Sequence, residues 1–340
     1  MSIVIRPVQP SDHEQLIRLA QQAGIGMLSL PPDPDALAAK IENSCLSFAG
    51  TPARPHEEAF LMVMEDTATG QLAGTTGIFA HVGLSRPFYS YKLSTVVQAS
   101  VEVGVYSQHQ VLHMVNDYTN ATEIGALFLL PDYRRDGLGS MLSRCRYLLL
   151  AEFPEIFSDT VIAEIRGVSN DDGGAPFYDN LAQHFFKMPF HEADFTSATQ
   201  GNQFIADLMP KYPIYVNLLP EAAQAVIGKP LPASEAAMRL LMREGFSYEG
   251  YVDVFDAGPT LQAERKRIRG VQNSEKANVA MIVDQIASGD RYLICNARMP
   301  DFRICMDTVD VTPEGELIIT RSTADKLNLE TGDAIRYTPA

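Results

Sequence analysis

A turn that contains two glycines, set between an apolar strand and an amphipathic helix, is the feature that most restricts how this sequence can fold. Residues 124–130 form a nearly continuous apolar run of strand length, and Pro131 ends it. Apolar side chains then recur at helical spacing from about residue 137 to residue 153, which predicts a helix. The segment between the two reads Arg134-x-x-Gly137-x-Gly139. We therefore expect a strand–turn–helix unit here.

The same segment has the properties of an anion-binding site. A helix N-terminus carries free backbone N–H groups and about half a positive charge. Glycines let the backbone approach a phosphate without Cβ collisions, and the preceding Arg134 adds a charge-assisted contact. The pyrophosphate of coenzyme A fits such a site, and the adjacent strand can pair with the pantetheine amides. The alternative explanation is that the glycines serve packing and the arginine solvation.

Other phosphate-binding and hydrolytic motifs are absent from the sequence. It has no Gly-x-x-x-x-Gly-Lys-Ser/Thr loop and no Gly-x-Ser-x-Gly elbow, and no helix is expected after Gly70–Gly77. A net charge of −15 argues against a nucleic-acid-binding protein. No apolar run approaches the ~20 residues that span a membrane, and the N-terminus does not read as a signal peptide. We therefore expect a cytoplasmic protein with no nucleic-acid or membrane partner.

Periodicity along the chain predicts strands and helices in mixed order. Strands are expected over residues 2–8, 59–65, 71–82, 124–130, 161–165 and 248–255. Helices are expected over residues 11–23, 34–48, 137–153, 175–186, 202–209, 221–227 and 235–245. A loop rich in glycine and proline is expected over residues 24–32. Such an order predicts a central sheet with helices packed on its faces.

The charged segment 262–276 is the best candidate for a linker. It would divide the chain into residues 1–270, with an extension from about residue 200, and a C-terminal region over residues 271–340. The second region looks strand-like, with turns at residues 313–315 and 331–333. We therefore expect two domains.

Cysteine and histidine spacing does not indicate a metal site, so none is expected. The four cysteines are scattered, and His109 and His113 are spaced i, i+4 without a third ligand. Cys145 falls inside an apolar helical pattern and is predicted to be an inert core thiol. Packing is also the favoured explanation for His184, Tyr133 and Tyr178.

The turn and its strand resemble the acyl-CoA motif of the GNAT superfamily. Ordered blocks on both sides resemble the arginine N-succinyltransferase family, namely residues 4–8, 28–31, 88–92, 163–167, 208–215, 244–246 and 253–261. The resemblance implies an α/β (α+β) fold, with a central mixed sheet, flanking helices and a β-rich C-terminal region. Residues 319–333 of that region also resemble half of a double-psi β-barrel. The implied reaction joins the succinyl group of succinyl-CoA to L-arginine, with succinyl-CoA as co-substrate and no permanently bound cofactor.

The resemblance also implies a set of site residues. Contacts to succinyl-CoA are expected from Leu127, Leu129, Arg134, Arg135, Gly137, Leu138, Gly139 and Ser140. Leu127 matches the family's own succinyl-CoA contact, and backbone N–H groups around Leu129 would face the thioester carbonyl. Glu123 lies where GNAT enzymes often place a carboxylate base, although a solvated charge at the strand end explains it as well.

Substrate contacts are expected from charged residues in the family blocks. The guanidinium of arginine favours carboxylates, and the candidates are Glu164, Asp253 and Asp256. The succinyl carboxylate favours a cation, for which Lys92 or Arg166 is suitable. Structural capping is an equally good explanation for the three acids.

One position departs from the family pattern. The family places an acid/base histidine shortly after a block that here reads Val226-Ile227-Gly228, and this chain has Leu231 in that place. Leucine cannot exchange a proton, so three functions stay open. They are an arginine N-succinyltransferase, an acyltransferase for another amine such as ornithine, and a non-catalytic CoA-binding subunit. Some family members work as paired chains, so a homo-oligomer or a complex with a related subunit is expected.

Overall fold

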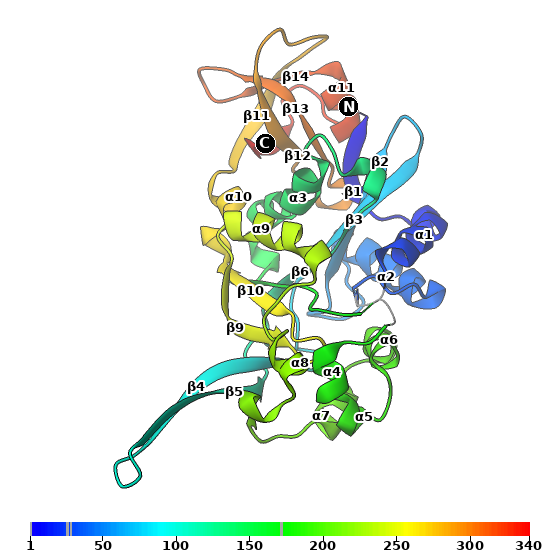
Figure 1. The fold of residues 1–340 in the computed structure, drawn as a ribbon. Coiled ribbons are helices and arrows are strands. Elements are labelled where there is room, and N and C mark those ends of the chain that lie inside the picture. The colour runs from blue at the N-terminus through cyan, green and yellow to red at the C-terminus, as the bar shows by residue number, and fades with distance from the viewer. Residues whose placement is uncertain (1, 25–26, 28, 171–172) are drawn as a thin grey trace.

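The predicted strand–turn–helix unit is present near the middle of the molecule (Figure 1). The computed structural model describes residues 2–24, 27, 29–170 and 173–340. Strand β6 (Thr122–Leu129) is followed by helix α3 (Leu138–Glu152). Leu142, Cys145 and Leu149 of α3 are fully buried, as their spacing predicted. The unit is therefore held in place by the core on the inner face of the helix.

The N-terminal elements also form as predicted. They are β1 (Ile3–Pro7), α1 (His13–Ala23), α2 (Pro34–Phe48), β2 (Ala59–Asp66) and β3 (Gln71–Phe79). Helix α1 ends at Gly24, whose φ of 78° favours glycine. Helix α2 begins where the Asp33 side chain accepts a hydrogen bond from the Ala36 N–H. Residues 25, 26 and 28 of the predicted loop and family block lie outside the described residues.

The strands form one mixed sheet whose centre positions the site. Its order is β12-β15-β11-β14-β13-β1-β2-β3-β6-β7-β10-β9-β4-β5-β8. The neighbours of β6 on one side are β7 (Thr160–Glu164), β10 (Pro259–Glu264) and β9 (Ser247–Asp253). Strand β7 runs parallel to β6, whereas β10 and β9 are antiparallel to their neighbours. The predicted central mixed sheet is confirmed.

The region from residue 176 to residue 243 is mostly helical; its part up to residue 227 packs as a second core, whereas residues 235–243 pack against the first core through Leu241. Its elements are α4 (Pro176–Asn180), α5 (Gln183–Phe186), α6 (Phe190–Gln200), α7 (Gln203–Leu208), β8 (Ile214–Tyr215), α8 (Glu221–Gln224) and α9 (Glu235–Arg243). The helix predicted over residues 175–186 is broken at Leu181, which adopts φ −134° and ψ −76°. Helix α6 was not predicted, and α8 ends three residues earlier than expected.

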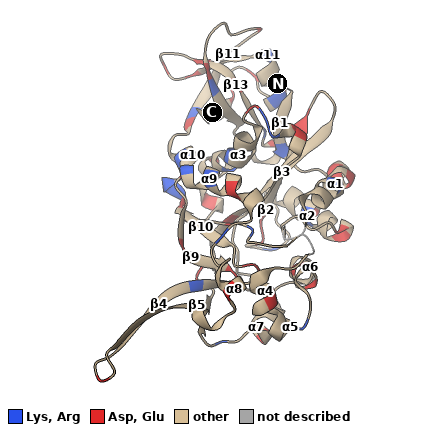
Figure 2. Cartoon of the chain, viewed as in Figure 1, with Lys and Arg blue, Asp and Glu red and all other residues tan. Residues whose placement is uncertain are grey.

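A long hairpin was missed altogether. Strands β4 (Ser90–Ser100) and β5 (Val105–Val115) pair along their whole length. Only residues 90–92 of β4 also pair with β9, and only Val111 and Leu112 of β5 pair with β8. The outer part projects from the body as a two-stranded arm (Figure 1). Figure 2 shows that the arm carries almost no charged residues between its base and its tip.

The C-terminal region is β-rich, as predicted, and lies at the end of the molecule opposite the arm (Figure 1). It contains β11 (Glu275–Val283), β12 (Asp290–Asn296), β13 (Ile304–Val311), β14 (Leu317–Thr320), α11 (Arg321–Leu327) and β15 (Ala334–Pro339). The Ile5–Ile304 pair joins it to β1. The division at residue 270 and the double-psi likeness stay predictions. No helix among the described residues is long and apolar enough to cross a membrane.

The prediction of a linker over residues 262–276 was wrong. Gln262 belongs to β10 and pairs with Ile162, and the segment continues into α10 (Arg269–Gln272). Arg265 forms an ion pair with Asp159 at 3.1 Å, and Ile268 is fully buried. The charges that suggested a linker are therefore partly engaged within the fold.

Candidate active site

The candidate site begins where the parallel strands β6 and β7 separate. Their register contains two pairs, Thr122–Val161 and Glu123–Ile162. Beyond them the strands border a cavity of about 880 Å³, which residues 123–129 and 163–166 line on opposite sides. Backbone groups that would otherwise complete a ladder are thus available to a ligand with amide groups.

A β-bulge bends β6 beside this cavity. The register with β3 shifts between Thr75 and Gly77, and Ala126 adopts a left-handed φ of 51°. The Ala126 N–H donates to Ser29 Oγ at 3.0 Å, and its carbonyl accepts from Thr75 Oγ1 at 2.7 Å. Bulges re-aim backbone groups and are frequent next to active sites. Two side chains therefore hold an unfavourable backbone conformation at the cavity wall.

The predicted anion-binding turn lies at the same cavity. Asp136 and Gly137 both have left-handed φ values, 54° and 80°, and Gly137 is the N-cap of α3. A Cβ at Gly139 would meet only Leu129 Cδ2, at an ordinary 3.8 Å. Packing therefore does not require glycine at position 139, and the predicted phosphate contact stays a possible reason for it. Arg134 Nε donates to the Leu129 carbonyl at 3.0 Å, which holds the turn against the strand.

Most of the predicted co-substrate contacts are brought together. Those that line the cavity are Leu127, Leu129, Arg134, Arg135, Gly137 and Gly139. The Leu138 side chain instead points into the core, where it is 4% exposed. The structure does not place Ser140 among the lining residues. For these two residues, only backbone contacts from the first helical turn fit the prediction.

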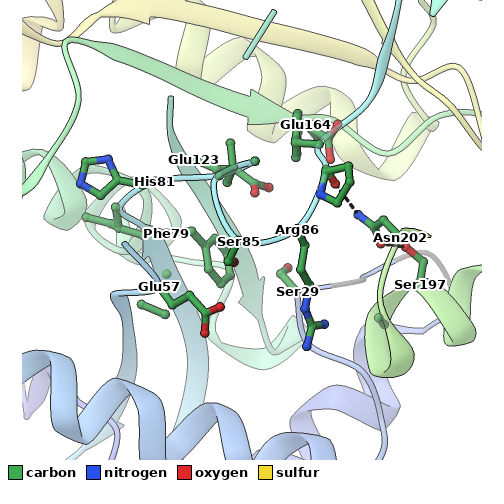
Figure 3. Close-up of a pocket in the computed structure, with 18 of the residues that line it drawn as sticks. Ser29, Glu57, Phe79, His81, Ser85, Arg86, Glu123, Glu164, Ser197 and Asn202 are labelled. Atoms are coloured by element: carbon green, nitrogen blue, oxygen red, sulfur yellow. Dashed lines mark hydrogen bonds between the residues drawn. The ribbon is translucent and has the colours of Figure 1, made fainter. Parts of the chain in front are cut away.

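A second cavity of about 370 Å³ meets the first one. Both cavities are lined by Ser29, Glu123, Glu164, Asp253 and Phe255. The second is bounded further by residues 56–61, 77–79, 81–83 and 85–89. Figure 3 shows Glu123 and Glu164 together on one side of this cavity, with Glu57 and Arg86 across from them. Three carboxylates thus lie where the two cavities join.

These carboxylates have strongly perturbed pKa values. Burial, and then the charge of Asp253, raise the pKa of Glu123 to about 7, against the opposing effect of Lys40. Burial and the charges of Asp253, Glu123 and Asp256 raise the pKa of Glu164 well above its ordinary value. Within the described part of the chain, neither glutamate side chain has a hydrogen-bond partner. Both are therefore available to a ligand.

The two aspartates have structural partners as well. Burial raises the pKa of Asp253 although its Oδ1 accepts the N–H groups of Phe255 and Asp256, at 2.7 and 2.9 Å. Asp256 accepts the N–H groups of Gly167 and Gly258, both at 2.7 Å, and burial with the charge of Asp253 raises its pKa to about 8. Asp256 therefore caps the turn after β9, as the alternative explanation had it.

Sequence reasoning missed the cation beside Glu123. Lys40 on α2 lines the second cavity, and its ammonium lies 5.9 Å from the centre of the Phe79 ring. Burial lowers the pKa of Lys40, and the charge of Glu123 opposes that shift. One signal was available in the sequence, because Lys40 falls on the same helical stripe as the buried Leu37 and Ile41.

The two predicted succinate-binding cations differ in position. The Lys92 ammonium lies 3.9 Å from the centre of the Tyr251 ring and donates to the Glu249 carbonyl, and Lys92 lines neither cavity. Arg166 lines the first cavity and donates to the Ala23 carbonyl at 3.1 Å. Only Arg166 is therefore brought to the site.

The packing predictions for other reactive side chains are largely confirmed. Cys145 is buried, which raises the pKa of its thiol to about 12. Tyr178 is fully buried and donates to the Met188 carbonyl, and Tyr133 packs against the core. His184 is exposed on α5, so core packing was wrong for this residue.

Two family models together match nearly the whole chain. The model for the arginine N-succinyltransferase beta subunit matches residues 3–270, and the model for the C-terminal domain of that subunit matches residues 275–339. The chain belongs to the arginine N-succinyltransferase family. Arginine N-succinyltransferases from Escherichia coli O139:H28 and Shigella flexneri are each 40% identical to it over 336 residues, which cover 98% of this chain and 96% of theirs.

A solved structure supports the same family. Arginine/ornithine succinyltransferase subunit AI from Pseudomonas aeruginosa matches with a TM-score of 0.90 at 34% identity, and the match covers 99% of this chain and 98% of that one. The predicted fold class and family are thus confirmed.

The position of the family histidine lies beside the first cavity in this family member. The Leu231 N–H donates to the Arg166 carbonyl at 2.8 Å, next to the Gly167–Pro230 bridge. The residues that follow, Ala233 and Ser234, line the cavity. The departure at Leu231 therefore lies next to residues that line the first cavity.

Proposed function

We propose that this chain transfers the succinyl group of succinyl-CoA to the α-amine of L-arginine and releases CoA. One observation carries the proposal: a cleft that starts at the N-terminus of helix α3 meets a second cavity at three half-buried carboxylates. A thioester in the cleft and an amine in the second cavity would meet at this junction. Membership of the family supports the choice of both substrates.

The cleft suits the co-substrate along its length. The pyrophosphate would lie on the turn from Arg134 to Gly139, where the α3 N-terminus supplies N–H donors. The pantetheine arm would follow the edge of β6 that faces β7, because this edge lacks a ladder partner beyond Glu123. The thioester would then lie beside the bulge at Ala126, with N–H groups of β6 as oxyanion donors.

Glu123 is the best placed general base. The α-amine of the substrate is largely protonated at pH 7, so a base assists the attack. With a pKa of about 7, Glu123 is ionised in about half of the molecules at that pH. It would take one proton from the ammonium, so that the neutral amine attacks the thioester carbonyl and the C–N bond forms. The C–S bond then breaks, and the leaving thiolate takes the second proton that the attacking nitrogen gives up.

The charges of the second cavity suit an amino acid with a cationic side chain. Lys40 and Arg86 are its cations and would hold the α-carboxylate. Glu57 and Glu58 lie away from the junction and would hold the guanidinium, because Glu58 Oε2 is buried with no hydrogen-bond partner among the described residues. Glu164 would then face the reacting amine and not the guanidinium.

A thiol-release assay tests the proposal. The purified chain is mixed with succinyl-CoA or acetyl-CoA and with arginine, ornithine or lysine. We expect the fastest release with succinyl-CoA and arginine. A faster reaction with ornithine would favour the second candidate function, which Leu231 and the arginine/ornithine name of the P. aeruginosa relative support. No amine-dependent release with any pair would refute catalysis by the chain alone and would favour a non-catalytic CoA-binding subunit.

We also propose that the chain is cytoplasmic. We further propose that it assembles through the β4–β5 arm with a second copy or with a related subunit. The arm exposes apolar side chains at its tip, including Val101 at 97% and Tyr106 at 65%, and isolated two-stranded ribbons are marginally stable. The P. aeruginosa relative is called a subunit. Light scattering of a Val101→Lys, Tyr106→Lys variant tests the assembly, with the exposed Tyr212→Lys as control. A wild-type chain that is monomeric would contradict the self-assembled form.

A further inference from the structure

Arg146 is a buried cation without a buried anion. It lies on α3, is 2% exposed, and lines the first cavity. Its Nε donates to the Ser143 carbonyl at 2.8 Å and its Nη2 to Ser143 Oγ at 2.9 Å. Both acceptors are neutral and belong to the same helix. No carboxylate among the described residues forms an ion pair with it.

The other buried arginines behave differently. Arg6 pairs with Asp12 at 2.7 Å, Arg336 with Glu152 at 2.8 Å, and Arg265 with Asp159 at 3.1 Å. Burial of a charge is strongly unfavourable unless a counter-charge compensates it. Consistent with this, burial lowers the pKa of Arg146, and only Tyr147 and Cys145 oppose the shift, with no aspartate or glutamate among its causes. Within the described chain, the compensating anion is missing.

We propose that Arg146 binds an oxyanion of the acyl-CoA co-substrate, an inference that rests on the proposed function of the cleft. Helix α3 begins at the anion-binding turn, and Arg146 lies about 12 Å along it from Leu138. Its side chain turns back onto Ser143, and it lines the same cavity as the turn and the carboxylates of the junction. A phosphate of CoA and the terminal carboxylate of the acyl group share the required chemistry.

Arg146→Met tests this assignment, because methionine is apolar and helix-compatible but carries no charge. Two quantities are measured: the thermal midpoint of the ligand-free chain, and the dissociation constants of CoA, acetyl-CoA and succinyl-CoA by calorimetry. We expect an equal or higher midpoint, because an uncompensated charge is removed. We expect at least a tenfold weaker dissociation constant for one or more of the ligands. A residue with only a structural role would lower the midpoint and leave binding unchanged.

Arg144→Met is the matched control on the same helix. Arg144 pairs with Glu244 at 3.0 Å and donates to the Pro339 carbonyl at 2.7 Å. Its loss should lower the midpoint and leave all three dissociation constants within about twofold. Arg146→Lys, which keeps the charge, is expected to retain most of the binding. If Arg146→Met does not fold, the dissociation constants of Arg146→Lys are compared with those of Arg146→Gln, which gives the same test.

The ligand series identifies the source of the oxyanion. Weaker binding of all three ligands assigns Arg146 to a phosphate of CoA, and weaker binding of succinyl-CoA alone assigns it to the acyl carboxylate. Both outcomes support the proposal. If Arg146→Met and Arg146→Gln bind all three ligands as tightly as the wild type does, the role of Arg146 is refuted. The proposed acyl-CoA cleft is not affected by that result. A wild-type chain that binds none of them refutes the acyl-CoA cleft, and the inference with it.

Discussion

Glu123→Gln tests the proposed chemistry most directly. Glutamine keeps the size of the side chain but cannot accept a proton from the amine. General bases of this kind contribute roughly 10²- to 10⁴-fold, so kcat/KM at about pH 8 should fall by that factor. CoA binding should change little, because the pyrophosphate turn lies at the other end of β6.

The pH dependence sharpens the test. A base must be ionised to act, so activity is lost as the pH falls through its pKa. With a pKa of about 7 for Glu123, the ionised fraction rises from about 9% at pH 6 to about 91% at pH 8. The wild-type kcat/KM should therefore rise about tenfold over this interval. The Glu123→Gln variant should lose the midpoint near pH 7, and its residual kcat/KM should follow the deprotonation of the substrate amine instead, when thioester consumption is followed at each pH.

Glu164→Gln is the matched control for this rise of kcat/KM around pH 7. Burial and the neighbouring carboxylates raise the pKa of Glu164 well above its ordinary value, and glutamine resembles the protonated form that this shift favours. The kcat/KM of this variant should still rise around pH 7, even if its absolute value is lower than that of the wild type. If Glu123→Gln keeps the rise of kcat/KM around pH 7 and Glu164→Gln loses it, the assignment of Glu123 as the base is refuted.

Three further outcomes are expected. Gly139→Asp should abolish CoA binding in calorimetry by placing a carboxylate at the pyrophosphate site, and unchanged affinity would mean that the turn is not that site. Leu231→His should raise kcat if the chain has lost a proton-transfer group, whereas an unchanged kcat would show that the histidine is not needed here. The raised pKa values of Glu123 and Asp256 make the folded chain hold protons that the unfolded chain releases above about pH 4. The thermal midpoint of the ligand-free chain should therefore fall between about pH 5 and pH 8, and a midpoint that rises over this range would contradict the buried cluster.

Elements with a strong local signal could be predicted from the sequence. Helix α2 has Asp33 as N-cap and a buried stripe at helical spacing, and its bounds agree with the prediction. The unit β6–α3 combines an apolar strand, a proline and a glycine turn. In each case the signal comes from residues close in sequence, so no tertiary information is needed.

Elements whose environment is set by distant residues could not be predicted. The arm β4–β5 has both faces largely exposed beyond its base, so no alternation of apolar and polar residues marks it. The break at Leu181 interrupts an apolar pattern that continues through Phe186, where both residues are needed in the second core. Tertiary packing overrides local propensity there.

The candidate site divides in the same way. The pyrophosphate turn is a local motif, and its residues were found by spacing. The carboxylate cluster joins β6, β7 and β9, and only the family resemblance connected these segments. Asp256 lines the first cavity and also accepts the N–H groups of Gly167 and Gly258, so its role in substrate binding stays a prediction.

The two cations that the sequence did not reveal share one property. Lys40 lies on the buried stripe of α2, and Arg146 lies on that of α3, next to Cys145. A cation on such a stripe opposes folding unless a counter-charge compensates it, so its presence predicts either a buried ion pair or a ligand. Lys40 has Glu123 as its counter-charge. Arg146 has none within the described chain, and for this reason a bound oxyanion is the expected partner.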